Sequence, residues 1–370
     1  MRSASLLQAG LTASLALGAA PTALALDFGL PGAGTGDFYG QLSPVWLSFD
    51  DGTQSIARLV DNNDSNSRAG LVLSWPVGTD TTIAFQAEAA LGFFQSNLLT
   101  MDGLGDIPWL FWNASFIRKL EFKVEGEAGT FWAGQGNMAS YEVAEFDYSG
   151  TVVAGYSDYQ AIAGGFTFVP RGGGAPGPAI KDVFVNLEGS RRFRLRYDTP
   201  TLSGFVLSVA AGDNQLTDAP GSYADAALRY TVETDRLRLG GGVGYALTQM
   251  PGAADSRAVM GSVAVLDRLT GLNAALAAGR QIDGGSYLYA KLGWLADLLP
   301  VGRTALAAEY YGSDGIGFDG QGRSWGLIAL QRFDALSTEV YLGYRHYALD
   351  GGATDYLGSQ SFVIGSKWTF

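Results

Sequence analysis

The sequence contains no cysteine and only one histidine among its 370 residues. Without cysteine there is no disulfide framework, no CxxC redox pair and no thiolate metal site. A single histidine also speaks against a histidine-based zinc or iron site. Basic residues are scarce, and the net charge of −12 argues against nucleic-acid binding, which needs a basic face. We therefore predict no cofactor and no nucleic-acid partner.

The first 25 residues have the pattern of an export signal. Arg2 supplies the positive start, residues 6–20 form an apolar stretch, and Ala23-Leu24-Ala25 matches an A-x-A cleavage site. The apolar stretch is too short to cross a membrane as a stable helix. We predict a signal peptide over residues 1–25 and one exported domain over residues 26–370.

Long apolar runs are missing from the rest of the chain, although 47% of its residues are hydrophobic. Glycine and aromatic residues are abundant, with 52 Gly, 17 Tyr, 20 Phe and 8 Trp. A transmembrane β-barrel reconciles these features. Its strands alternate apolar residues toward lipid with polar or small residues toward the lumen, so no long apolar run is needed.

Several segments show this alternation directly. In residues 286–295, Leu288, Leu292 and Trp294 share one face, and Tyr289 and Lys291 lie on the other. A period of two predicts a strand whose two faces meet different surroundings. We expect sixteen strands in all, over residues 36–49, 67–76, 80–93, 109–124, 127–136, 182–197, 203–213, 222–232, 235–247, 256–266, 269–280, 284–296, 302–312, 322–333, 337–349 and 359–370.

Short and long connections alternate between these strands. The longer ones are residues 50–66, 94–108, 137–181, 212–221, 313–321 and 350–358. Membrane barrels have short turns at one end and longer loops at the other, and an even strand count lets the last strand pair with the first. Closure satisfies every backbone group inside lipid. The alternative is a secreted β-sandwich or β-helix, but such a chain would normally divide into domains, and no linker is evident.

Three segments resemble the general porins, the trimeric channels of Gram-negative outer membranes. The Ser67-Arg68-Ala69-Gly70 stretch is similar to the start of that family's second strand. Residues 189–205 resemble the strand, turn and strand that follow the third loop. The end of the chain, with Phe362, Ile364, Trp368 and Phe370, looks like the signal read by the barrel-assembly machinery.

The resemblance implies an all-β, transmembrane, antiparallel 16-stranded barrel whose long third loop folds into the lumen. It also implies a homotrimer in the cell outer membrane, embedded in outer-membrane lipid. Phe370 would serve as its contact with the assembly machinery. The expected function is passive diffusion of ions and small hydrophilic solutes through a water-filled channel, rather than catalysis.

The resemblance places the constriction of the pore in the third loop, residues 137–181. Arginine on the lipid face at the bilayer midplane costs about 2–4 kcal/mol, so the arginines of the next strand should face the lumen. A transverse field between loop carboxylates and wall arginines would select solutes by size and charge. The alternative is that the arginines only fill a polar lumen. The candidate residues are Arg192, Arg194, Arg196, Glu142, Glu145 and Asp147.

The segment Asp61–Ser67 resembles a calcium loop in composition, but it lacks the glycine and glutamate of an EF-hand. We interpret it as a solvated loop and keep calcium as a minor alternative.

A substrate-specific channel of the same fold is an alternative function, because tyrosines cluster in residues 141–159. An outer-membrane lipase or protease lacks support, since no nucleophile motif accompanies His346. A structural barrel or adhesin would be expected to have fewer strands.

Overall fold

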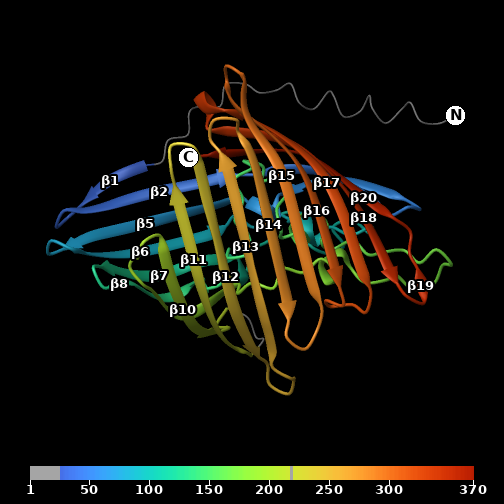
Figure 1. The fold of residues 1–370 in the computed structure, drawn as a ribbon, viewed down its shortest axis with the longest axis horizontal. Coiled ribbons are helices and arrows are strands. Elements are labelled where there is room, and N and C mark those ends of the chain that lie inside the picture. Colours follow the sequence, from blue (N-terminus) through green and yellow to red (C-terminus); the bar gives the residue numbers. More distant parts are fainter. Residues whose placement is uncertain (1–25, 217–219) are drawn as a thin grey trace.

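The computed structural model describes residues 26–216 and 220–370, so the expected signal peptide lies outside the described residues. A single antiparallel sheet closes on itself into a barrel (Figure 1). Within the described ranges, no helix is long and apolar enough to cross a membrane.

Sixteen strands form the wall, as predicted. The first is β2 (Gly34–Leu42) continued by β3 (Pro44–Asp50), and the second is β4 (Ser55–Asp61) continued by β5 (Arg68–Val77). The other fourteen are β6 (Thr81–Ala90), β7 (Ile117–Gly126), β8 (Gly129–Asn137), β9 (Arg191–Asp198), β10 (Phe205–Asp213), β11 (Ser222–Glu233), β12 (Leu237–Gln249), β13 (Ser256–Asp267), β14 (Leu272–Gln281), β15 (Ser286–Leu299), β16 (Gly302–Asp314), β17 (Gln321–Phe333), β18 (Thr338–Gly351) and β20 (Ser359–Thr369).

The last strand closes the barrel by pairing with the first. Ile364 of β20 is opposite Trp46 of β3, and Trp368 is opposite Leu42 of β2. Two further short strands, β1 (Leu26–Leu30) and β19 (Thr354–Asp355), pair with β2 and β18 respectively. Closure leaves the wall without an open edge where first and last strands meet, which membrane-embedded backbone requires.

Alternation along the strands is confirmed by burial. In β15, Leu288 and Leu292 are 53% and 69% exposed, whereas Tyr289 and Lys291 are each 2% exposed. The same parity places apolar side chains on the outside of every long strand.

Some turns between strands contain glycine because their backbone has a positive φ. Gly78, between β5 and β6, has a φ of 68°, which residues with a Cβ rarely adopt.

Two predicted strands were too long at their starts. The strand expected over 109–124 begins only at Ile117, because Asn113 caps a short 3₁₀ helix, η3 (Ala114–Phe116), by accepting from the Ser115 amide. The strand expected over 182–197 begins at Arg191. Before it lies the short helix α2 (Ile180–Val183), and the apolar residues that follow, such as Phe184, are buried within the long connection that precedes β9. Apolar alternation alone does not separate a lipid-facing strand from a loop core.

The prediction of a long loop over residues 50–66 was wrong. Residues 55–61 of this segment are β4, which pairs with β3 and extends the wall. The residues after β4, with the 3₁₀ helix η1 (Asn63–Ser65), form an inward bulge between β4 and β5. Asn62 is fully buried, and its side-chain amide donates to the Val153 carbonyl of the long loop at 2.6 Å.

The solvated-loop interpretation of Asp61–Ser67 fails for the same reason. Asp61, Asn62, Asn66 and Ser67 are each at most 4% exposed. The Asp61 carboxylate accepts from the Ser67 amide at 2.9 Å and from the Ser67 hydroxyl at 2.5 Å. These polar residues connect the two halves of the second strand, because buried polar groups need hydrogen-bond partners.

Candidate pore lining

The connection between β8 and β9, residues 138–190, packs against the inward-facing side of the wall. Phe166 stacks on Phe49 of β3 with 3.9 Å between ring centroids, and Tyr159 lies 4.9 Å from Tyr311 of β16. All four rings are buried, whereas Tyr310, next to Tyr311, is exposed on the outer face. The connection, with its short helix α1 (Gln160–Ala163), is thus held on the inner side of β3 and β16.

Two buried ion pairs hold this side of the barrel together. Lys291 Nζ lies 2.7 Å from Asp147 Oδ2 and also donates to the Gly155 carbonyl at 2.7 Å. Arg345 Nε lies 2.6 Å from Glu309 Oε1, with side chains 4% and 0% exposed. Asp147, one of the candidate constriction carboxylates, is therefore compensated by Lys291 and serves as an attachment of the loop.

Arg194 and Arg196 face inward, as predicted, and both hold the start of the loop. Arg194 Nη2 lies 2.5 Å from Glu121 Oε2, and its Nε donates to the Asn137 carbonyl at 3.0 Å. Arg196 pairs with Asp198 at 2.9 Å and donates to the Met138 carbonyl, also at 2.9 Å. The positive charges of Arg194 and Arg196 are therefore neutralised by carboxylates of the protein itself.

Arg192 belongs to a different group of arginines, which we call the arginine cavity. The cavity has a volume of about 290 Å³ and is lined in part by Arg118, Arg191 and Arg192. Arg68 lies beside Arg118, and the two share the carboxylate of Glu88 at 3.5 and 2.6 Å. Among the described residues, no carboxylate lies within 4 Å of Arg191 or Arg192. Within the described structure, this part of the lining thus carries positive charge that no carboxylate pairs with.

Sequence reasoning missed the roles of Arg68, Arg118 and Arg191. Simple alternation gives Arg191 the parity of Phe193 and Leu195, which face lipid. Arg191 is the first residue of β9, however, and its guanidinium turns inward to donate to the Tyr141 hydroxyl. Its carbon lies 4.8 Å from the centre of the Tyr141 ring. The only signal in the sequence was the unbroken Arg191-Arg192 pair at the start of a strand.

Carboxyl groups of the loop lie near these arginines. Glu142 is exposed and adopts a φ of 63°, a conformation rare for a residue with a side chain. The carboxylate of Glu188 accepts from the Glu142 amide at 2.7 Å and from the Ala144 amide. Asn186 donates to Glu145 at 2.9 Å. Glu142 also lies within electrostatic range of Arg191.

Burial changes the charge of this acidic group. It raises the pKa of Glu188 to about 8 against the effect of the two amides, which favour the ionised form. It also raises the pKa of Glu145 well above its usual value, and the neighbouring Glu188 and Asp158 act in the same direction. Burial further raises the pKa of Asp64 in the inward bulge. The acidic side therefore carries less negative charge at neutral pH than its composition indicates.

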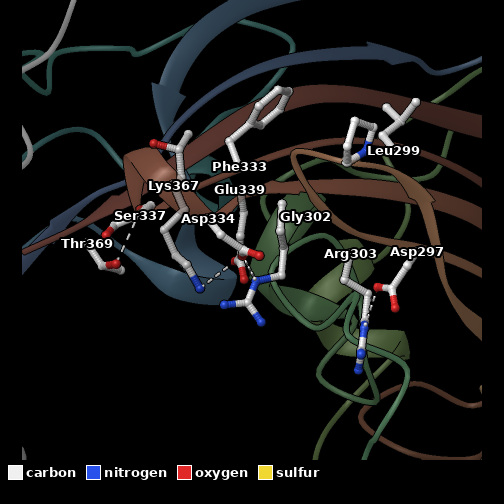
Figure 2. A pocket seen from close by; sticks show the side chains of 13 residues that line it. Asp297, Leu299, Gly302, Arg303, Phe333, Asp334, Ser337, Glu339, Lys367 and Thr369 are labelled. Atoms are coloured by element: carbon white, nitrogen blue, oxygen red, sulfur yellow. Dashed lines mark hydrogen bonds and ion pairs between the residues drawn. The ribbon is translucent and has the colours of Figure 1, made fainter.

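A second charged zone lies at the end of the barrel that carries the short turns (Figure 2). It is a cavity of about 790 Å³ bounded by the ends of β15–β18 and β20. Here cations and carboxylates alternate in pairs. Lys367 lies 2.7 Å from Glu339, and Arg303 lies 3.3 Å from Asp297. Because the charges are paired, this mouth has a weaker net field than the arginine cavity.

A closed antiparallel barrel with an apolar outer face and charged groups inside belongs to the class of channel-forming outer-membrane proteins. A sequence model described as Gram-negative porin matches residues 10–360, and the chain belongs to that family. Its function is accordingly that of an outer-membrane channel for passive diffusion. None of the curated protein sequences matches the chain.

Solved structures show the same fold. The anion-selective porin from Comamonas acidovorans superposes with a TM-score of 0.61 at 17% identity, covering 91% of this chain and 100% of that one. OmpF of Salmonella typhi, in complex with daunomycin, gives 0.60 at 15% identity, covering 93% and 100%. A trimer form of OmpT from Vibrio cholerae gives 0.55 at 16% identity, covering 91% and 99%.

Proposed function

We propose that solutes are selected between the arginine cavity and the carboxyl groups of the 138–190 loop. The observation that carries the proposal is a pair of neighbouring guanidiniums, Arg191 and Arg192, that no described carboxylate pairs with, of which Arg191 lies within electrostatic range of the exposed Glu142. Opposite charges on facing walls create a transverse field that orders water and discriminates solutes by charge. This assignment keeps Arg192 and Glu142 of the predicted constriction. It gives Asp147, Arg194 and Arg196 the task of attaching the loop.

Reversal potentials in planar bilayers test the field. The double variant R191Q/R192Q is expected to shift selectivity toward cations, because it removes two positive charges from the lining. E142Q is expected to shift selectivity the opposite way. K367Q is the control, since Lys367 is paired with Glu339 at the far mouth. Unchanged reversal potentials in R191Q/R192Q and E142Q would overturn the proposal.

Ion selectivity should also depend on pH through Glu188. A carboxyl group with a pKa near 8 is mostly neutral at pH 7 and mostly ionised at pH 9. Raising the pH across this window adds a negative charge beside Glu142, Glu145 and Asp158, so cation preference should increase. E188Q should lose most of this shift. A wild-type reversal potential that stays constant from pH 7 to 9 would contradict the prediction.

Assembly and export complete the proposal. A homotrimer is supported by family membership and by the trimer form among the structural neighbours. We also propose that residues 1–25 are a cleaved export signal and that Phe370 is read by the barrel-assembly machinery. The Phe370 amide and carbonyl bond to Gly40 at 3.0 and 2.8 Å, so this residue marks the seam between first and last strands. A substrate-specific channel is the second candidate, favoured by the arginine cavity.

A further inference from the structure

We propose that the arginine cavity is a binding site for small solutes that carry two or more negative charges on carboxylate or phosphate groups. The inference rests on the proposed function and deepens it. The proposed function is a field that discriminates between passing solutes, and the inference adds a class of solutes that the channel binds. It rests on three observations: excess charge, unused hydrogen-bond donors, and a cavity of suitable size.

The described residues around the site do not balance its positive charge. Three guanidiniums, those of Arg118, Arg191 and Arg192, line the site, and that of Arg68 lies beside it; Glu88 is the one carboxylate paired with these four in the described structure. The local sum is therefore three positive charges. Arg68, Arg118 and Arg191 are close enough to repel one another electrostatically. A multiply charged anion would relieve this repulsion, whereas a single chloride would relieve only part of it.

The guanidiniums keep donors free. Arg118 uses only Nε for Glu88, Arg191 uses Nη2 for Tyr141, and Arg192 uses Nη1 for the Arg191 carbonyl. The remaining Nη groups have no partner among the described residues, and the Nε atoms of Arg191 and Arg192 are buried without one. The planar fork of arginine matches the two oxygens of a carboxylate or phosphate.

The arginines are held in place rather than free to fold away. The Arg192 guanidinium carbon lies 3.9 Å from the centre of the Tyr223 ring, and that of Arg191 lies 4.8 Å from the Tyr141 ring. Cation–π contacts and the Glu88 pairing fix the guanidiniums before a solute arrives, which lowers the entropic cost of binding. Neutral polar groups, including Asn63, Gln95 and Gln135, complete the lining and suit a hydroxylated solute.

The size of the cavity limits the solute. Its volume of about 290 Å³ is near the lower end of the range for small-molecule sites. Inorganic phosphate or a tricarboxylate of a few carbons fits this space. The Arg118 and Arg68 side chains are 19% and 23% exposed, so a solute in the pore can reach them.

Two probes test the proposal, inorganic phosphate and tricarballylate, each against chloride. In single-channel recordings, both should cause saturable, concentration-dependent blockade of the wild-type channel. Calorimetry on the detergent-solubilised protein should detect their binding without reference to conduction. R191K/R192K keeps both charges but loses the planar fork, so it should retain ion selectivity while binding weakens by about tenfold or more. K367R at the far mouth is the matched control and should leave binding unchanged.

The outcomes separate this proposal from the proposed function. Conducting wild-type channels with no blockade and no heat of binding would overturn the binding site and leave the channel function intact. The absence of conductance would instead contradict the channel function. A third outcome is equal blockade in wild type and R191K/R192K together with a changed reversal potential in R191Q/R192Q. It would show that the arginines act on solutes only through their electric field, and it would also overturn the binding site. Tenfold weaker binding in the lysine variant with preserved selectivity would support it.

Discussion

Excision of residues 141–187, with Ser140 joined to Glu188 through a short glycine linker, is expected to raise single-channel conductance several-fold. The segment fills space against the inner side of β3 and β16, and a barrel of sixteen strands without it should leave a wide aqueous channel. Its two ends already meet, because the Gly189 amide donates to the Ser140 hydroxyl at 2.8 Å. Ser140 is also anchored by its own amide to Asp225 at 2.7 Å.

The measurement is conductance in planar bilayers, with ion selectivity recorded on the same channels. Selectivity should fall together with the gain in conductance, because Glu142 and Glu145 leave with the loop. Heat-modifiable migration on gels and tryptophan fluorescence would establish that the shortened barrel is folded. A folded, shortened barrel with the conductance of the wild type would show that the loop does not restrict the pore.

Replacement of Arg345 by methionine is expected to destabilise the barrel by about 3–5 kcal/mol, because it leaves the Glu309 carboxylate buried without a cation. The variant also loses the contact of the guanidinium with the Tyr159 ring, where 3.9 Å separates its carbon from the ring centre. Tyr159 belongs to the loop, so its release should add current noise to open channels. The midpoint of urea unfolding, followed by tryptophan fluorescence in detergent, gives the loss of stability.

Two further variants show whether burial sets this cost. K367M removes a cation from a half-buried pair, with side chains 19% and 23% exposed, and should cost less than about 1 kcal/mol. The double variant E309L/R345M replaces both charges by apolar groups and should recover most of the lost stability. Equal midpoints for R345M and K367M would contradict the assignment of Arg345 as a buried structural charge.

The strands were predictable because alternation is a local property of the chain. From Ser222 to the end, every predicted strand begins and ends within three residues of the observed one. Predictions failed where apolar residues lie in a loop core, as at Phe184, or where polar residues are buried, as at Asn62. In both places the surrounding residues come from segments distant in sequence, so the local pattern of apolar and polar residues does not predict the burial.

The sequence by itself determined the class of protein, a closed membrane barrel with lipid outside and charge inside, since each strand shows both faces in its own residues. It also placed Arg194 and Arg196 on the inner face. Only the tertiary structure decided which charges are paired. Asp147 meets Lys291 across 144 residues of sequence, which removes it from the free carboxylates of the pore. Arg191, whose parity favours lipid, turns inward at the end of its strand and leaves uncompensated charge beside Arg192. Charge pairing depends on distances across the barrel, and these exist only after the loop has folded against the wall.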